Sequence, residues 1–399
     1  MLSSSNISVP DTLALFKSAG INVAFLVPTE TGLLKSIMDA HDSVREFFKE
    51  QGLHDYEAQG QGAGSKVTIE TLLITSIGVV ETTASLYRPE SKSGDPRIWI
   101  YGLKKHAAAG DLLALAVHRK KLVVLNASES DLEKTLKHHP VLNQISALQQ
   151  STIRPEATEL LTMLKGVGRE GWIQTLRKGD TGVGFTLEEK LGIAANSSKA
   201  PDYKGIELKS HRHRKGKGTQ IAAFSQVPDW KNSRLKGSKE ILRERGKFSE
   251  DRQRNQLFHE ISSLKPNSYG LQLSLSDDGY LLHQLYVPEG GGAPVEKDVQ
   301  WAMEKLQARM QEKHTETMWV TAEATGKGAG EAFHYTEAIH TYGYDSSAFT
   351  LLLETGAMTV HYLIKELPNG AVKDQGYLFK TAPKYISTLF ASSHKHVLV

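Results

Sequence analysis

The chain has no cysteine in its 399 residues, so disulfide bonds and thiolate metal sites are excluded. No apolar run approaches the roughly 18 residues that a membrane-spanning helix needs, and no basic-then-apolar signal sequence stands at the N-terminus. Internal repeats and low-complexity tracts are lacking as well. We therefore expect a cytoplasmic protein that has no association with membranes.

The chain also has no large excess of positive or negative residues. The formal net charge is only +3, which by itself gives no reason to expect a nucleic-acid partner, so the local distribution of charge has to decide. Hydrophobic residues make up 39% of the chain. Its length is sufficient for two domains with separate cores.

The first part of the chain has the pattern of a strand-rich domain. Helical spacing extends from Thr31 to Phe48 and closes at Gly52. The predicted strands cover residues 23–27, 67–77, 79–87, 97–101, 112–117 and 122–125, the last two as a hairpin. We predict a first domain over residues 1–145, a linker over 146–165 and a second domain over 166–399.

Residues 88–106 combine several basic side chains with two aromatic rings and a turn. Arg97 and Lys104 are the candidate DNA contacts, because a loop of this kind can grip a phosphate backbone or read bases. The alternative is a solvated hairpin that places Trp99 in the core.

The stretch from Asp202 to Lys209 carries the strongest chemical signal. Strand alternation puts Glu207 and Lys209 on one face, and a tight turn at Lys204-Gly205 would bring Asp202 back beside Glu207. Two carboxylates suit a hard cation such as Mg²⁺, and the ammonium can orient a water and offset charge on a phosphate. This arrangement suits phosphodiester hydrolysis, although a solvated strand edge with alternating charges gives the same pattern.

Helices are predicted at residues 172–176, 185–193 and 299–313. Glu188 lies near the start of the second of these helices. It either projects toward the carboxylate site or lies on an exposed face. Glu189 fits a capping box with Thr186.

A basic run follows the Glu-x-Lys strand. Its candidate phosphate contacts are Arg212, Arg214, Lys215 and Lys217, and a solvated charge run is an equal alternative. The glycines at 326–330 lack the spacing of a nucleotide-binding loop. His334 and His340 have no third ligand at a convincing spacing, so we predict no zinc site.

Residues 181–193 and 197–210 resemble the core of MvaI/BcnI-type restriction endonucleases, which are relatives of the mismatch-repair nickase MutH. Residues 224–230 and 331–335 continue the match in the same order, and it covers roughly residues 165–399. The resemblance implies an α/β protein with a PD-(D/E)xK nuclease fold, a mixed sheet flanked by helices.

The resemblance also implies roles for individual residues. Asp202 and Glu207 would bind Mg²⁺, Lys209 would be catalytic, and Glu188 matches the helix glutamate that accompanies this site in MutH-like enzymes. Further DNA contacts are assigned to Lys231, His334 and Lys373. One departure concerns Lys373-Asp-Gln-Gly376, because many relatives carry His-Asp-His-Gly or His-Asp-Arg-Gly there. If this loop reads bases, the recognition sequence of the relatives does not transfer directly to this chain.

The strand-rich first domain resembles the arrangement in UbaLAI-type enzymes, in which a B3-like barrel akin to the effector domain of EcoRII binds a second DNA site. The similarity depends on residues 97–102 and 109–113 and on strand content.

Together these features predict a monomeric type II restriction endonuclease that acts on double-stranded DNA, with a second duplex as effector. A MutH-like repair nickase, whose first domain binds a protein partner, is one alternative. A catalytically inactive DNA-binding protein is another, which the complete set of Asp202, Glu207 and Lys209 disfavours.

Overall fold

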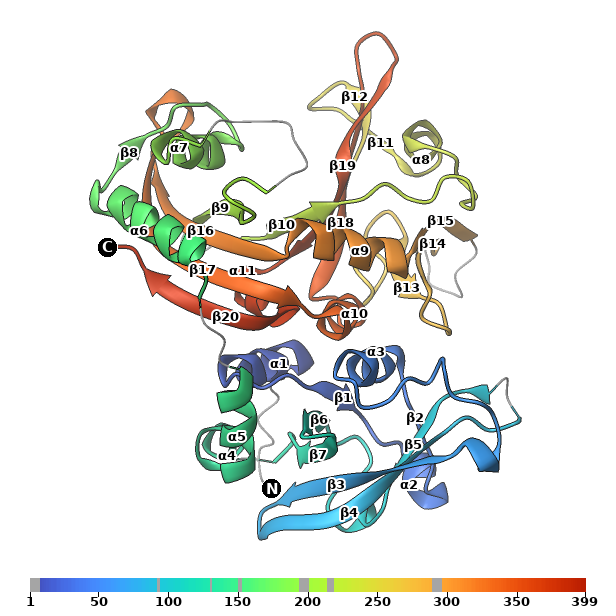
Figure 1. Ribbon diagram of the computed structural model, residues 1–399. Helices are drawn as coiled ribbons and strands as arrows, with labels where there is room; N and C mark the ends of the chain where they lie inside the picture. The colour runs from blue at the N-terminus through green and yellow to red at the C-terminus, as the bar shows by residue number, and fades with distance from the viewer. Residues whose placement is uncertain are drawn as a thin grey trace, which may run out of the picture. The chain divides into compact units, whose positions relative to one another are not determined.

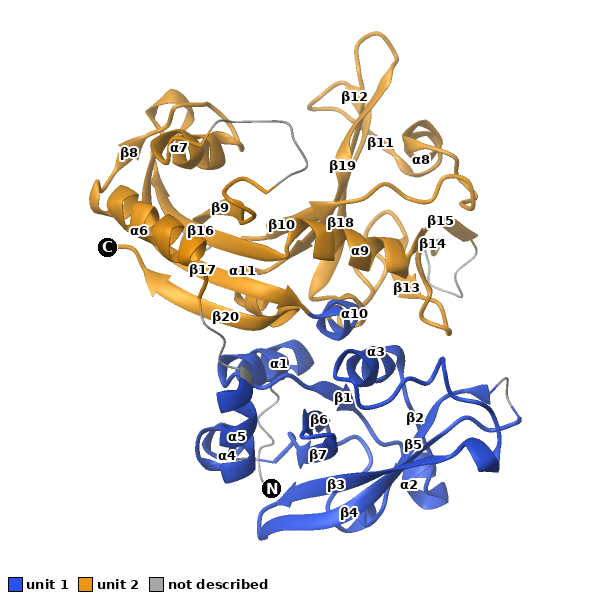
Figure 2. Cartoon of the chain, viewed as in Figure 1, with its two compact units in different colours: residues 1–151, 345–351 blue, residues 152–344, 352–399 orange. Residues whose placement is uncertain are grey.

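The computed structural model describes residues 8–91, 94–129, 131–149, 153–193, 201–213, 219–288 and 296–399. The chain divides into two compact units (Figure 2). Unit 1 comprises Met1–Ser151 and Asp345–Leu351, and unit 2 comprises Thr152–Tyr344 and Leu352–Val399. A segment from late in the chain therefore belongs to the first unit, which the sequence did not predict. No helix among the described residues is long and apolar enough to cross a membrane.

Unit 1 is built on one seven-stranded sheet, which confirms its strand-rich character. The strands, in their order across the sheet, are β1 (Ala24–Leu26), β6 (Leu113–His118), β7 (Lys121–Asn126), β3 (Val67–Thr75), β4 (Gly78–Tyr87), β5 (Arg97–Ile100) and β2 (Met38–Asp39). The helices are α1 (Val9–Ser18), α2 (Glu30–Lys35), α3 (Asp42–Glu50), α4 (Leu132–His138) and α5 (Pro140–Gln149) (Figure 1).

The single helix predicted from Thr31 to Gly52 is wrong. Ser36 adopts a left-handed conformation with φ of 57°, which ends α2, and the two-residue strand β2 separates α2 from α3. Met38 in β2 pairs with Ile98 of β5, so a tertiary strand contact interrupts the helical spacing.

The sheet of unit 1 has apolar side chains on both faces. Ala84, Leu86, Ile98 and Ile100 are fully buried in one core together with α3. The other core packs side chains of α1, α4 and α5 against β1, β6 and β7. Two separate cores on one sheet account for the apolar runs in the central strands.

The first sheet of unit 2 is mixed. Its strands run in the order β20 (Phe390–Val397), β17 (Ala332–Tyr344), β16 (Glu316–Thr325) and β9 (Glu207–His213), and β8 (Ile173–Gln174) pairs with the start of β17. β9 is parallel to β16, whereas the other pairs are antiparallel. The helix α6 (Pro155–Arg169) packs on β17, and α7 (Gly182–Lys190) packs on β9.

Two further sheets complete unit 2. One has the order β10 (Ile221–Ser225), β19 (Val372–Thr381), β18 (Met358–Glu366), β12 (Arg254–Ile261) and β11 (Lys247–Ser249). The other comprises β13 (Leu271–Leu275), β14 (Leu281–Tyr286) and β15 (Glu296–Ala302). The remaining helices of unit 2 are α8 (Ser238–Arg245), α9 (Met303–Lys313) and α11 (Pro383–Ile386), whereas α10 (Ser346–Glu354) lies in unit 1 up to Leu351.

Two of the helix predictions for the second domain need correction. Residues 172–176 contain strand β8, because Ile173 pairs with Phe333 and the side chain of Gln174 donates to the carbonyls of Ala329 and Glu331. The helix predicted over 299–313 begins only at Met303, because the preceding residues pair with β14. In both places strand pairing with a distant segment overrides local spacing.

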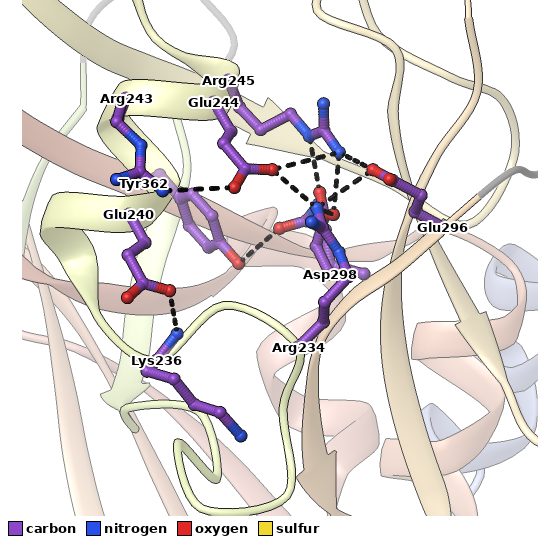
Figure 3. Close-up of polar contacts among 10 residues, drawn as sticks. Arg234, Lys236, Glu240, Arg243, Glu244, Arg245, Glu296, Asp298 and Tyr362 are labelled. Carbon is purple, nitrogen blue, oxygen red and sulfur yellow. Dashed lines mark hydrogen bonds and ion pairs between the residues drawn. The ribbon is translucent and has the colours of Figure 1, made fainter.

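A buried cluster of charges joins α8 to the three-stranded sheet (Figure 3). Asp298 has no exposed side chain and accepts two hydrogen bonds from Arg245, at 2.8 and 2.9 Å, and one from Arg234. Gln284 donates to the same carboxylate at 2.7 Å and accepts from the hydroxyl of Tyr362 at 3.1 Å. The carboxylate is thus fully hydrogen-bonded, as burial of a charge requires.

Candidate active site

The turn predicted at Lys204-Gly205 is confirmed. Tyr203 and Ile206 bridge each other, and both central residues have positive φ, 45° at Lys204 and 88° at Gly205. This conformation is that of a tight hairpin turn. It returns Asp202 to the start of β9, where its Oδ2 accepts a hydrogen bond from the backbone N–H of Leu208 at 2.9 Å.

Glu207 receives two ammonium groups on the same oxygen. The Nζ of Lys209 lies 2.5 Å from its Oε1, and the Nζ of Lys313 lies 2.9 Å from that atom. Burial alone would raise the pKa of Glu207, but the two lysines outweigh it and hold the pKa below its ordinary value. The carboxylate is therefore ionised at neutral pH.

Lys313 was not among the residues predicted from the sequence. It lies at the end of α9, far along the chain from the Glu-x-Lys strand, and no motif marks it. β9 is parallel to β16, and α9 precedes β16 directly, so the end of α9 comes beside the start of β9. Only the strand pairing reveals this proximity.

The other two carboxylates of the site behave differently from Glu207. Burial raises the pKa of Asp202, and the nearby Glu207 raises it further. Burial also raises the pKa of Glu188, and the negative charge of Asp202 raises it further. Glu188 on α7 therefore lies near enough to Asp202 for their charges to interact, and its role in the carboxylate site stays a prediction. Crowding of half-buried carboxylates marks a site where a further positive charge would be stabilised.

Asp202, Glu207 and Glu188 offer the hard oxygen donors that Mg²⁺ prefers. No group of three or more histidine, aspartate or glutamate side chains is preassembled as a metal cluster in the described ranges. Glu207 instead contacts two ammonium groups, which supply the positive charge at this position. The donor chemistry fits a divalent cation that would share Glu207 with the lysines.

Helix α7 is fixed beside β9 by Arg212. The guanidinium contacts both carboxylate oxygens of Glu331, at 2.7 and 3.0 Å, and the carbonyls of Gly179 and Asp180, both at 2.7 Å. Gly182 is the first residue of α7, and a Cβ atom added to it would lie only 2.3 Å from the carbonyl oxygen of Arg177. The glycine at this position is thus a steric requirement.

The capping box predicted for Thr186 and Glu189 is wrong, because Thr186 is a fully buried residue within α7. Its hydroxyl accepts the backbone N–H of Leu176 at 3.0 Å and so ties the helix to the segment after β8.

The predicted DNA contacts of unit 2 lie in varied surroundings. Lys231 and Lys373 are exposed, whereas His334 lies within 3.2 Å of the carbonyl of Gly168 and packs against Trp172. Arg212 uses its donors within the protein, as described above. Arg214, Lys215 and Lys217 lie outside the described residues. The DNA-binding roles of all these residues stay predictions.

The two candidates of unit 1 also differ. Arg97 forms ion pairs with Asp39 and Asp95, and its side chain is only 13% exposed. Lys104 is exposed, its Nζ donates to the carbonyl of Leu34 at 3.1 Å, and it lies 5.6 Å from the ring centroid of Trp99. Trp99 itself is buried in the core, as the alternative for this segment foresaw.

The mixed sheet of unit 2, with α6 and α7 packed on it, has the α/β arrangement of an MvaI-like nuclease fold. The chain is similar to a solved complex of restriction endonuclease MvaI with a cognate DNA substrate, with 21% identity and a TM-score of 0.53. That similarity covers 62% of this chain and 100% of the other, and it concerns the fold. A structure of MvaI in the absence of DNA matches with 20% identity and a TM-score of 0.38, over 63% and 100% of the two chains.

The chain belongs to the MvaI/BcnI restriction endonuclease family, whose model matches residues 161–390, more than half of the sequence. It is therefore a DNA nuclease of the restriction endonuclease class. The model leaves the first 160 residues unmatched. No curated protein matches the chain.

Proposed function

We propose that the chain is a Mg²⁺-dependent type II restriction endonuclease that recognises a short site in double-stranded DNA and hydrolyses a phosphodiester. The observation that carries this proposal is the convergence of Asp202, Glu207 and Lys209 at the start of β9, in a chain whose family consists of restriction endonucleases. The cognate DNA in the MvaI complex belongs to that protein, and it supports duplex DNA as the substrate class here.

In this proposal Asp202 and Glu207 hold the cation, and Glu188 adds negative charge from α7. A bound Mg²⁺ would polarise the scissile phosphate and lower the pKa of the attacking water. The Lys209 ammonium, now on Glu207, would orient that water and offset the charge that grows on the phosphate. Lys313 would keep Glu207 ionised and in place.

The proposal extends to the whole chain. Lys231 and Lys373 are exposed and available to phosphates, and unit 1 binds a second duplex as effector. The enzyme acts in the cytoplasm as a monomer, so it must reverse its orientation between the cuts of the two strands. The support for unit 1 is its strand-rich sheet and its lysines, one of which is Lys104.

The direct test is incubation of the full-length protein with unmethylated plasmid DNA in Mg²⁺, followed by sequencing of the fragment ends. We expect discrete double-strand fragments with one common end sequence, and no product in EDTA. Nicked circles alone would instead indicate a repair nickase. Intact plasmid from a folded protein that still shifts DNA in gels would indicate a binding protein and contradict the proposal.

A further inference from the structure

Unit 1 contains a cavity of about 990 Å³ that none of the roles above explains. It opens on the face of β4 and β5 opposite the fully buried side chains of Ala84 and Ile100. Strand alternation puts Ser85 and Tyr87 of β4 on this face together with Trp99 and the neighbouring Tyr101, since Ser85 pairs with Trp99. The volume lies at the upper end of the range of roughly 300–1,000 Å³ for small-molecule sites.

Aromatic rings and lysines line this cavity together. Tyr101 is 44% exposed, so a face of its ring is available, whereas Trp99 is only 8% exposed and forms part of the wall. Lys66, Lys104 and Lys105 stand at the rim against a single acidic residue, Glu90. The lining therefore has an excess of positive charge although the chain as a whole is nearly neutral.

The lysines lie close to the rings. The Nζ of Lys66 is 3.4 Å from the hydroxyl of Tyr101 and 5.9 Å from its ring centroid, and that of Lys104 is 5.6 Å from the ring centroid of Trp99. The Oγ of Ser85 lies 3.4 Å from the same tyrosine hydroxyl. A stacking ring beside ammonium groups is the combination by which proteins hold unpaired nucleotides.

We propose that this cavity takes one unstacked deoxynucleotide of the DNA that unit 1 binds, which rests on the proposed DNA-binding role of that unit. The base stacks on Tyr101, and the flanking phosphates contact Lys66, Lys104 and Lys105. The carboxylate of Glu90 can accept a hydrogen bond from an exocyclic amino group of adenine or cytosine. The nucleotide comes either from a single strand or from a base turned out of a duplex.

The test uses the full-length protein in EDTA, so that no cleavage occurs. Three probes are compared: a duplex with one extrahelical 5-iodocytosine, the same duplex without the bulge and with the iodocytosine paired, and a single strand that carries the same base. Binding is measured by anisotropy, and ultraviolet crosslinks are mapped by mass spectrometry. We expect crosslinks at Tyr101 or Trp99 from the bulged duplex or from the single strand. The probe that gives the higher crosslink yield identifies the source of the nucleotide.

The variant Tyr101→Ala should lower the crosslink yield in this region roughly 5-fold or more, because loss of one base–aromatic stack has effects of that order. The matched control is Lys121→Ala, which removes a partly exposed lysine of the same unit that is paired with Glu70 and does not line the cavity. It should leave the yield unchanged. Circular dichroism shows whether either variant is misfolded, and Tyr101→Phe should keep most of the crosslinking.

Crosslinks elsewhere in residues 8–149 with no effect of Tyr101→Ala would overturn the cavity proposal but leave the DNA-binding role of unit 1 intact. Crosslinks confined to unit 2 with every probe would instead contradict that role itself.

Discussion

At the scale of single residues, Lys209 and Lys313 share one oxygen of Glu207 but reach it from different elements. Lys209 is on the same strand as Glu207, whereas Lys313 ends a helix. A lysine on the strand can turn its ammonium toward a phosphate without moving the backbone. The two lysines should therefore differ in their effect on cleavage.

We predict that Asp202→Ala, Glu207→Ala and Lys209→Ala each lower cleavage at least 1,000-fold, of the order seen when a principal electrostatic group is removed. DNA binding in Ca²⁺ should change little, because it depends mainly on contacts elsewhere. Lys209→Arg should restore little activity, because a planar guanidinium does not replace a compact ammonium. Plasmid cleavage and gel shifts measure both quantities, and activity of the arginine variant within a few-fold of wild type would show that Lys209 is only a counter-charge.

Replacement of the second lysine tests its supporting role. Lys313→Met should lower cleavage by roughly 10- to 100-fold, less than Lys209→Ala, because one ammonium still neutralises Glu207. Part of the lost rate should return at higher pH, since the loss of Lys313 raises the pKa of Glu207. Lys305→Met on the same helix serves as the control. A loss as complete as that of Lys209→Ala would place Lys313 in direct contact with the reacting groups.

At the scale of elements, α8 is joined to β14 and β15 through Asp298. Burial on its own would raise the pKa of this carboxyl, but the hydrogen bonds and charges of Arg245 and Arg234 outweigh it and lower the pKa. A lowered folded pKa means that the ion pairs stabilise the fold above the unfolded pKa of about 3.9. The stabilisation is lost as the pH falls through the lower, folded value.

Asp298→Asn should therefore destabilise unit 2 by about 2–3 kcal/mol at neutral pH, the range for a buried hydrogen-bonding group that loses its charged partner. The difference from wild type should shrink as the pH falls below about 4. Urea unfolding of both proteins at several pH values measures this difference in the free energy of unfolding. Glu244→Gln, at a partly exposed position of the same cluster, should cost less than about 1 kcal/mol. A constant difference for Asp298→Asn across the pH range would contradict this account.

The turn before β9 is the other element with a clear consequence. Gly205 has φ of 88°, a value that side chains rarely adopt. Gly205→Val should therefore move Asp202 away from Glu207 and lower cleavage about 10-fold or more, while thermal stability falls by only about 1 kcal/mol. Gly64→Val, at an open glycine of unit 1, is the control. Wild-type cleavage by Gly205→Val would show that the turn does not place the carboxylate.

At the scale of the whole molecule, unit 1 is discontinuous. Asp345 is buried within it, and its Oδ2 lies 2.5 Å from the Nζ of Lys17, whose side chain is 3% exposed. Lys17 also donates to Asn22 at 2.6 Å. Burial alone would raise the pKa of Asp345, and the charge of Lys17 reverses this and lowers it. The N-terminal segment therefore depends on a residue that comes hundreds of positions later.

A fragment of residues 1–151 leaves Lys17 buried without its carboxylate. We predict that it is about 3–5 kcal/mol less stable than unit 1 in the full chain, the usual cost of breaking a buried ion pair from one side. Lys17→Met should recover part of this stability in the fragment but destabilise the full-length protein. Thermal melts of the fragment and the full-length protein, each with and without Lys17→Met, measure these differences. A fragment as stable as the intact unit would refute the dependence on Asp345.

The sequence by itself determined the elements whose cause is local. The hairpin of β6 and β7 follows from two apolar runs on either side of a basic turn at residues 119–121. The turn at Lys204-Gly205 and the shared face of Glu207 and Lys209 were also predictable, because strand periodicity and turn chemistry act over a few residues.

Tertiary structure decided what depends on distant partners. β8 and the last residues of β15, from Val299 to Ala302, were predicted as helices, because their pairing with β17 and β14 leaves no local mark. Lys313 reaches Glu207 only through the parallel pairing of β9 with β16. Asp345 belongs to unit 1 because a buried lysine needs a counter-charge, wherever in the chain that charge is found. Spacing along the sequence determines local geometry, whereas burial and pairing across the fold determine which charges meet.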